Sequence, residues 1–259
     1  DNIGNMTDQG IDIELSATAY KSKDWTWDIY LNASHISNEI TKLPSESSKD
    51  GVDAGLFWYQ EGQSRYDYYL KDYAGVNDQG QSVWYMDVLG TDGKPTGEKE
   101  LTTDYNAATR YYQGCALPTF YGGLGTTVRW KDIDFSLHTA YSIGGTGYDY
   151  NYRNLMHSGD SGVAWHKDIL NSWTEQNQNT NIPRLQAGEK TVNNTLSNRW
   201  LISSNYYSIQ NLTLGYTFPR ELLTKMHLAS LRVYGTAENL ALFSKRKGYD
   251  PRHAITGVN

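Results

Sequence analysis

The sequence predicts an all-β fold built from long antiparallel strands, and three observations support this prediction. Apolar and polar residues alternate with a period of two over several stretches that exceed the usual strand length of about 5–6 residues. Short polar turns join these stretches in pairs, and very long polar segments separate the pairs. The chain also contains 21 Tyr and 8 Trp but only 5 Phe, a balance typical of half-wet surfaces and membrane interfaces.

The alternation predicts six strands in three hairpins, at about residues 8–40, 119–146 and 199–241. In the first hairpin, an apolar row runs from Ile11 to Ala19, and a second row runs from Trp25 to Ala33 after a polar turn. The second hairpin turns near Lys131, and the third turns through a longer stretch at 219–229. Each strand therefore has one apolar and one polar face.

The segments between the hairpins, about 43–118 and 147–198, are long and polar. If neighbouring hairpins pair, every short turn lies on one rim and both long loops lie on the other, which is typical of a transmembrane β-barrel with long extracellular loops. Six strands would leave two open edges, and lipid offers an edge no hydrogen-bond partner, so we expect a section of a larger barrel. One further strand would be needed to return the chain to the short-turn rim.

A soluble, secreted β-rich glycan-binding module without transport is the alternative, because loop aromatic residues would serve it equally well. The direction of the apolar face distinguishes the two. A barrel exposes that face to lipid, whereas a sandwich buries it against a second sheet of the same chain.

Composition excludes several other classes. A net charge of −6 argues against a nucleic-acid partner. The single cysteine, Cys115, cannot form an internal disulfide, and we expect it to be a small buried residue. The segment Gly122-Gly123-Leu124-Gly125 lies within an alternating strand, so we interpret its glycines as strand glycines rather than as a phosphate loop. We therefore expect no enzyme activity, no catalytic residue, no cofactor and no metal site.

Several sequence motifs occur along the chain in a consistent order. The most specific is Ile209–Pro219 (IQNLTLGYTFP), followed by LRVY at 231–234 and ENL at 238–240. The others are 2–12 (NIGNMTDQGID), 73–76 (YAGV) with 84–85 (WY), 118–123 (PTFYGG), 142–145 (SIGG), and 165–174 with 182–184 (IPR). Together they resemble the C-terminal part of SusC/RagA-type TonB-linked outer-membrane proteins of the Bacteroidetes. Departures from the family pattern occur at Asp8, Asp12 and Glu175.

The resemblance implies a TonB-dependent importer of oligosaccharides or peptides in the outer membrane of a Gram-negative cell. Such proteins pair with a SusD-like surface lipoprotein that acts as a lid, and TonB supplies energy through an N-terminal plug. The plug and the final strand are expected to be absent here, so this segment alone would form barrel wall and outer loops without transporting anything.

Two groups of aromatic residues are candidate functional residues. We expect Trp25, Trp27, Trp130 and Phe218, near the short turns, to form an interfacial girdle, although core aromatics of a sandwich would show the same spacing. The second group lies in the long loops, and the resemblance suggests that its members contact substrate or lid. The alternative is that they pack the loops against one another. The group consists of Trp58, Tyr59, Trp84, Tyr85, Trp165 and Trp173. A helix is also predicted over 167–175, with Ile169, Leu170 and Trp173 on one face.

Overall fold

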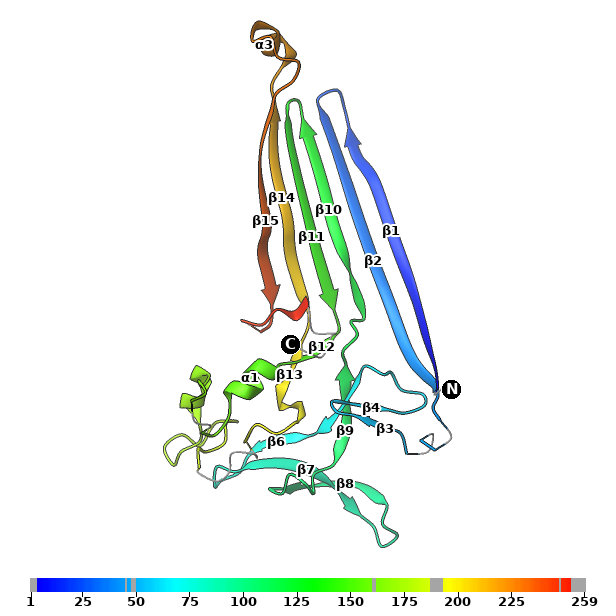
Figure 1. The fold of residues 1–259 in the computed structure, drawn as a ribbon, viewed down its shortest axis with the longest axis vertical. Helices are drawn as coiled ribbons and strands as arrows, with labels where there is room; N and C mark the ends of the chain where they lie inside the picture. The colour runs from blue at the N-terminus through cyan, green and yellow to red at the C-terminus, as the bar shows by residue number, and fades with distance from the viewer. Residues whose placement is uncertain are drawn as a thin grey trace.

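The computed structural model describes residues 4–44, 46–47, 50–159, 162–186, 193–246 and 248–252. A tall antiparallel sheet has six strands in the order β1-β2-β10-β11-β14-β15, and smaller sheets form a layer at one end of it (Figure 1). The six strands are β1 (Asn5–Lys21), β2 (Trp25–Lys42), β10 (Phe120–Trp130), β11 (Ile133–Ile143), β14 (Tyr206–Thr217) and β15 (Arg232–Ser244). The prediction of an all-β, antiparallel fold is confirmed.

All three connections within the hairpins of the tall sheet lie at the same end, opposite the loop layer (Figure 1). The turns are tied to one another, because the Lys131 amide donates to the Asp24 carbonyl at 2.8 Å and the Thr217 amide donates to the Asp132 carbonyl at 2.8 Å. The third connection is longer and contains the short helix α3 (Arg220–Lys225). Successive hairpins are therefore held in line at this rim.

The register gives the tall sheet one apolar and one polar face. Leu31 of β2 lies opposite Leu15 of β1 and Leu124 of β10, so apolar residues of neighbouring strands form continuous rows. These side chains remain exposed: Ile11 is 65 %, Leu15 58 % and Leu214 55 % accessible. Among the described residues, the buried apolar cluster lies in the loop layer rather than against this face.

The long segments between hairpins are folded rather than irregular. The first contains β3 (Val52–Ala54), β4 (Phe57–Tyr59), β5 (Asp67–Lys71) and β9 (Arg110–Cys115) in one sheet, and β6 (Tyr73–Val76), β7 (Ser82–Leu89) and β8 (Pro95–Thr102) in another. The second contains α1 (Tyr150–Leu155), the 3-10 helices η1 (Lys167–Asn171) and η2 (Asn198–Trp200), and strand β13 (Leu201–Ser203), which pairs with β12 (Thr146–Tyr148). The third hairpin consequently begins at Tyr206 rather than near residue 199.

The helix predicted over 167–175 is shorter than expected. It is the five-residue η1, which ends where the Ser172 amide donates to the Ile169 carbonyl. Ile169 is 7 % exposed but Leu170 is 86 % exposed, so the two do not share a buried face. No helix in the described part of the chain has the length and apolar character needed to cross a membrane.

Candidate functional site

The loop layer has a hydrophobic core that both long segments supply. Tyr68 from the first segment is fully buried, and Met156 and Trp200 from the second are 2 % and 1 % exposed in the same cluster. The indole Nε1 of Trp200 donates to the Thr195 carbonyl at 2.8 Å, and burial raises the pKa of Tyr68 far above its ordinary value. Because residues this buried cannot move independently, the layer forms a platform for the residues on its surface.

Among the predicted contact residues, Trp84 lies deepest in this layer. It is 1 % exposed, and its ring makes edge contacts with Tyr105 at 5.4 Å and Tyr73 at 6.1 Å between ring centroids. No acceptor among the described residues reaches its Nε1 atom. The buried position favours the alternative interpretation of this residue, that it packs the loops against one another. Its neighbour Tyr85 is half-buried, with the Lys99 ammonium 5.8 Å from its ring.

Trp58 and Tyr59 are half-buried in β4. Trp58 is the first of three aromatic rings in a row, an arrangement that the sequence did not predict. The centroid of its ring lies 5.5 Å from that of Tyr69, and the Tyr69 centroid lies 4.9 Å from that of Tyr112. The three residues come from β4, β5 and β9, so only strand pairing brings them together. Burial raises the pKa of Tyr112 above its ordinary value.

Trp165 is the most exposed of the predicted contact residues, at 49 %. It is nevertheless fixed in place, because its Nε1 donates to the His157 carbonyl at 2.8 Å and its ring stacks on the His157 ring at 5.5 Å. Trp173 is half-buried over Gly80, whose positive φ of 78° and missing side chain admit the ring. A Cβ at Gly80 would lie 2.5 Å from the indole, so this contact requires glycine.

A polar and aromatic cluster links β7, β8 and β9, and sequence reasoning missed it. The Lys99 ammonium lies 3.5 Å from the centroid of the Tyr111 ring, and the Tyr111 hydroxyl donates to Asp87 at 2.5 Å. Burial, followed by this hydrogen bond to a carboxylate, raises the pKa of Tyr111 to about 12. The three residues are separated by 12 or more positions and carry no motif, so no signal in the sequence links them.

Arg199 is a second feature that the sequence did not reveal. Its guanidinium lies 4.5 Å from the ring of Trp200 and 4.9 Å from the ring of Tyr73, and it donates to the Asn193 carbonyl at 3.1 Å. Burial lowers its pKa. A desolvated cation held on aromatic faces thus joins the two long segments.

The four predicted girdle residues lie at the short-turn end of the tall sheet. Trp25 and Trp130 face each other across β2 and β10 with ring centroids 5.7 Å apart, and they are 42 % and 43 % exposed. Trp27 is 44 % exposed, and its Nε1 donates to the Thr126 hydroxyl at 2.9 Å. Phe218 is half-buried, and its ring packs edge-on against that of Tyr216 with the ring centroids 5.0 Å apart.

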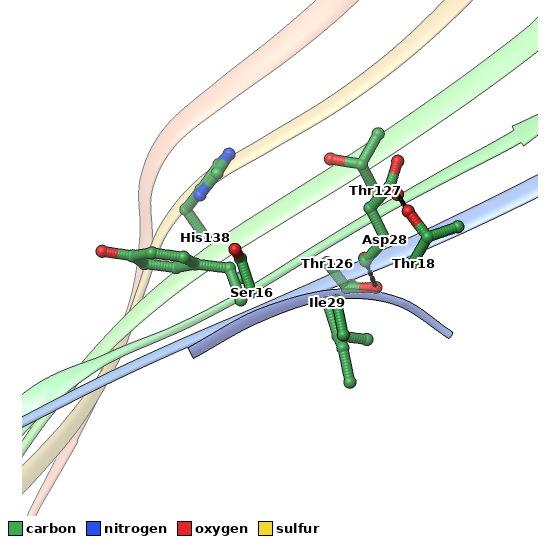
Figure 2. Close-up of a pocket in the computed structure, with 10 residues that line it drawn as sticks. Ser16, Thr18, Asp28, Ile29, Thr126, Thr127 and His138 are labelled. Atoms are coloured by element: carbon green, nitrogen blue, oxygen red, sulfur yellow. Dashed lines mark hydrogen bonds between the residues drawn. The ribbon is translucent and has the colours of Figure 1, made fainter. Parts of the chain in front are cut away.

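The polar face of the tall sheet carries a groove of about 390 Å³. Figure 2 shows Thr18, Asp28, Thr127 and His138 on one side of the sheet and Ile29 on the other. The groove passes over Gly125, whose partners on both sides are large: a Cβ there would lie 3.2 Å from His138 Nδ1 and 3.5 Å from the Tyr30 ring. The Thr18 hydroxyl donates to Asp28 at 2.7 Å at one end of it. These groups suit contact with water and polar chains.

A glycine also permits an ion pair on this polar face. Arg232 of β15 reaches over Gly215 of β14 to Asp134 of β11, with Nη2 and Nε donating to the two carboxylate oxygens at 2.6 and 3.1 Å. A Cβ at Gly215 would lie 2.5 Å from the guanidinium. Such two-point pairing gives the cross-strand contact a fixed geometry.

Comparison with known proteins confirms the resemblance predicted from the motifs, although no family model matches the chain. The chain is 28 % identical to TonB-dependent receptor P3 of Formosa agariphila over 96 % of its own length and 25 % of the relative's. It is 25 % identical to TonB-dependent receptor SusC of Bacteroides thetaiotaomicron over 96 % of its length and 24 % of that receptor. The chain thus spans about a quarter of the length of the curated relatives it matches.

Solved structures show the same relationship. The chain superposes on the RagAB peptide transporter with a TM-score of 0.81 and 28 % identity, covering 96 % of this chain and 27 % of that one. For the RagAB peptide importer in its open-open state the TM-score is 0.75, with 26 % identity and coverage of 96 % and 26 %. The names of these relatives describe receptors and transporters rather than enzymes.

Proposed function

We propose that this chain, which resembles the C-terminal barrel section of SusC/RagA-type TonB-dependent receptors, forms barrel wall and outer loops of an outer-membrane nutrient importer. In this proposal the polar face lines the lumen and the apolar face contacts lipid. The loop layer lies outside the cell, and the short turns lie on the periplasmic side. TonB drives import through other parts of the receptor.

The exposed apolar face is the observation that carries this proposal. Rows that include Ile13, at 49 %, and Val233, at 59 %, remain accessible instead of packing on another sheet. A soluble protein rarely leaves so large a contiguous apolar surface in water, whereas a barrel wall requires it. The secreted glycan-binding module lacks this support.

We propose oligosaccharides as the substrate class, because the outer layer is rich in aromatic rings that can stack on sugar faces. Trp58, Tyr59 and Trp165 are the predicted residues best placed for such contacts, since each retains exposed surface on a rigid support. A peptide substrate is the second candidate, because the similar RagAB complex is a peptide transporter. Ligands retained by the receptor after gentle purification, identified by mass spectrometry, would separate the two classes.

A SusD-like lipoprotein is the proposed partner of one part of the loop layer, the exposed stretch 163–170. Val163, Trp165 and Leu170 are 51 %, 49 % and 86 % exposed within a short stretch, and exposed apolar residues on a rigid layer are typical of an interface. Leu170→Asp should therefore reduce co-purification of the lipoprotein with the tagged receptor. Leu89→Asp, at a comparably exposed position on the β7–β8 hairpin, should leave recovery unchanged; equal recovery with both variants would contradict the placement.

Cell fractionation with an antibody against this segment tests the proposal as a whole. We expect a band in the outer-membrane fraction that is far larger than 29.3 kDa and migrates differently before and after boiling. A band in the soluble fraction that migrates identically in both samples would overturn the proposal and restore the secreted binding module.

A further inference from the structure

The apolar face of the tall sheet contains a large hollow near the loop layer. Its volume is about 710 Å³, and apolar side chains from five strands surround it. The apolar lining consists mainly of Leu31, Leu124, Tyr141, Ile143, Tyr207 and Phe243. The register places these residues on the same face, with Leu31 opposite Leu124 and Tyr141 opposite Tyr207.

Small residues are the strand neighbours of two residues that line the hollow, Tyr141 and Leu124. Gly122 of β10 lies between Ala33 and Tyr141, and the Tyr141 hydroxyl reaches past it to donate to the Asn32 carbonyl at 3.1 Å. Thr139 is 5 % exposed and turns its hydroxyl to the Leu124 carbonyl at 3.0 Å, so its polar atom is satisfied within the sheet. The hydrogen bond of its hydroxyl therefore holds Tyr141, which lines the hollow, in place.

The rim nearest the loop layer is polar and positively charged. Asn205, Ser244 and Lys245 complete the lining there. Lys245 is exposed, and no carboxylate of the described residues lies within 4.0 Å of its ammonium. An apolar hollow beneath a cation matches a lipid that joins acyl chains to a phosphate.

We propose that this hollow binds an acyl chain of a phosphorylated outer-leaflet lipid, lipid A, with Lys245 at its phosphate. The proposal rests on the membrane orientation proposed above, which places the loop-layer rim in the outer leaflet. Water cannot fill an apolar hollow that opens into hydrocarbon, and empty space would forfeit packing, so an acyl chain is the natural occupant. The ammonium then favours an anionic headgroup over a zwitterionic one.

The opposite end of the apolar face offers a matched control. A second hollow of about 450 Å³ lies near the short turns, between Ile133, Leu214, Phe218 and Val233, and its lining contains no Lys or Arg. Gly235 lines it, and a Cβ there would meet no atom within 4 Å. A large residue at 235 can therefore fill this hollow without disturbing the sheet.

The test uses the whole receptor that contains this chain, reconstituted with lipid A, re-extracted, and analysed for retained lipid by mass spectrometry. Lys245→Glu should lower lipid A retention about 10-fold, because it replaces attraction with repulsion at the phosphate. Leu124→Trp should lower it similarly by filling the hollow. Lys131→Glu, at the other rim, and Gly235→Trp, in the second hollow, should retain as much lipid A as the native receptor.

Retention of two other lipids shows which part of lipid A the receptor recognises. Dephosphorylated lipid A should be retained less than lipid A, and Lys245→Glu should leave the retention of phosphatidylethanolamine unchanged. Unchanged lipid A retention in both Lys245→Glu and Leu124→Trp would overturn the proposal. Electrophoresis of boiled and unboiled samples of the same preparations distinguishes failure of the lipid site from failure of the proposed function. A heat-modifiable barrel that retains no lipid A refutes only the lipid site. A native receptor that forms no heat-modifiable barrel refutes the proposed function.

Discussion

Replacing Trp84 with Ala should loosen the loop layer rather than weaken a surface contact. The side chain is 1 % exposed and packs between Tyr73 and Tyr105. Truncation of a buried Trp to Ala costs about 3–5 kcal/mol, and the loss of two edge-to-face ring contacts places this change toward the upper end. By contrast, Trp84→Phe keeps most of the packing and removes an Nε1–H that has no acceptor among the described residues. Because an unsatisfied buried donor costs about 1–3 kcal/mol, the Phe variant should lose less than about 1.5 kcal/mol.

Hydrogen–deuterium exchange of the intact receptor measures this difference directly. Amides of β6, β7 and the segment around Tyr105 should exchange about 100-fold faster or more in Trp84→Ala, since each 1.4 kcal/mol of lost local stability corresponds to a factor of ten. The tall sheet should exchange as before and serves as the internal control. If Trp84→Ala left exchange in these strands unchanged yet abolished substrate or lid binding, Trp84 would be a contact residue and the packing interpretation would be refuted.

Three further predictions concern other parts of the chain. Gly215→Val should displace Arg232 from its ion pair and lower the temperature at which the barrel loses heat-modifiable migration, whereas Gly235→Val, with open space around the new side chain, should not. Burial raises the pKa of the Cys115 thiol to about 11, so its alkylation by iodoacetamide at pH 8 should be roughly 100-fold slower than in urea-unfolded protein; equal rates would show that the thiol is not shielded. Trp165→Ala should change stability by less than about 1 kcal/mol at this half-exposed site, yet reduce lid or substrate binding, and unaltered binding of both would remove it from the proposed contact surface.

The tall sheet could be predicted from sequence because its signal is local and repeated. Each strand carries its own alternation, as in Ile11 to Leu15, and the polar turn after Lys21 fixes which strand pairs with it. The same periodicity gives the apolar and polar faces. It cannot give bulges such as the one between Thr18 and Tyr20, which shift which residues face each other.

The loop layer could not be predicted because its order depends on contacts between distant segments. Its strands are short, from three residues in β4 to eight in β7, so alternation is too brief to detect. Trp84 has the sequence surroundings of a loop aromatic residue, yet it is buried once the rings of Tyr73 and Tyr105 pack against it. Sequence could identify the rings but not which of them remain at the surface.

The orientation of the two faces of the tall sheet is the central claim, and spin labels at neighbouring positions test it most directly. Ile13 and Glu14 of β1 are adjacent and point to opposite faces. In the intact receptor, with Cys115 replaced by Ser and reconstituted in a bilayer, we expect a label at position 13 to collide mainly with dissolved oxygen and a label at position 14 to collide mainly with a water-soluble nickel chelate. Equal accessibility of the two labels to the nickel chelate would contradict the membrane wall.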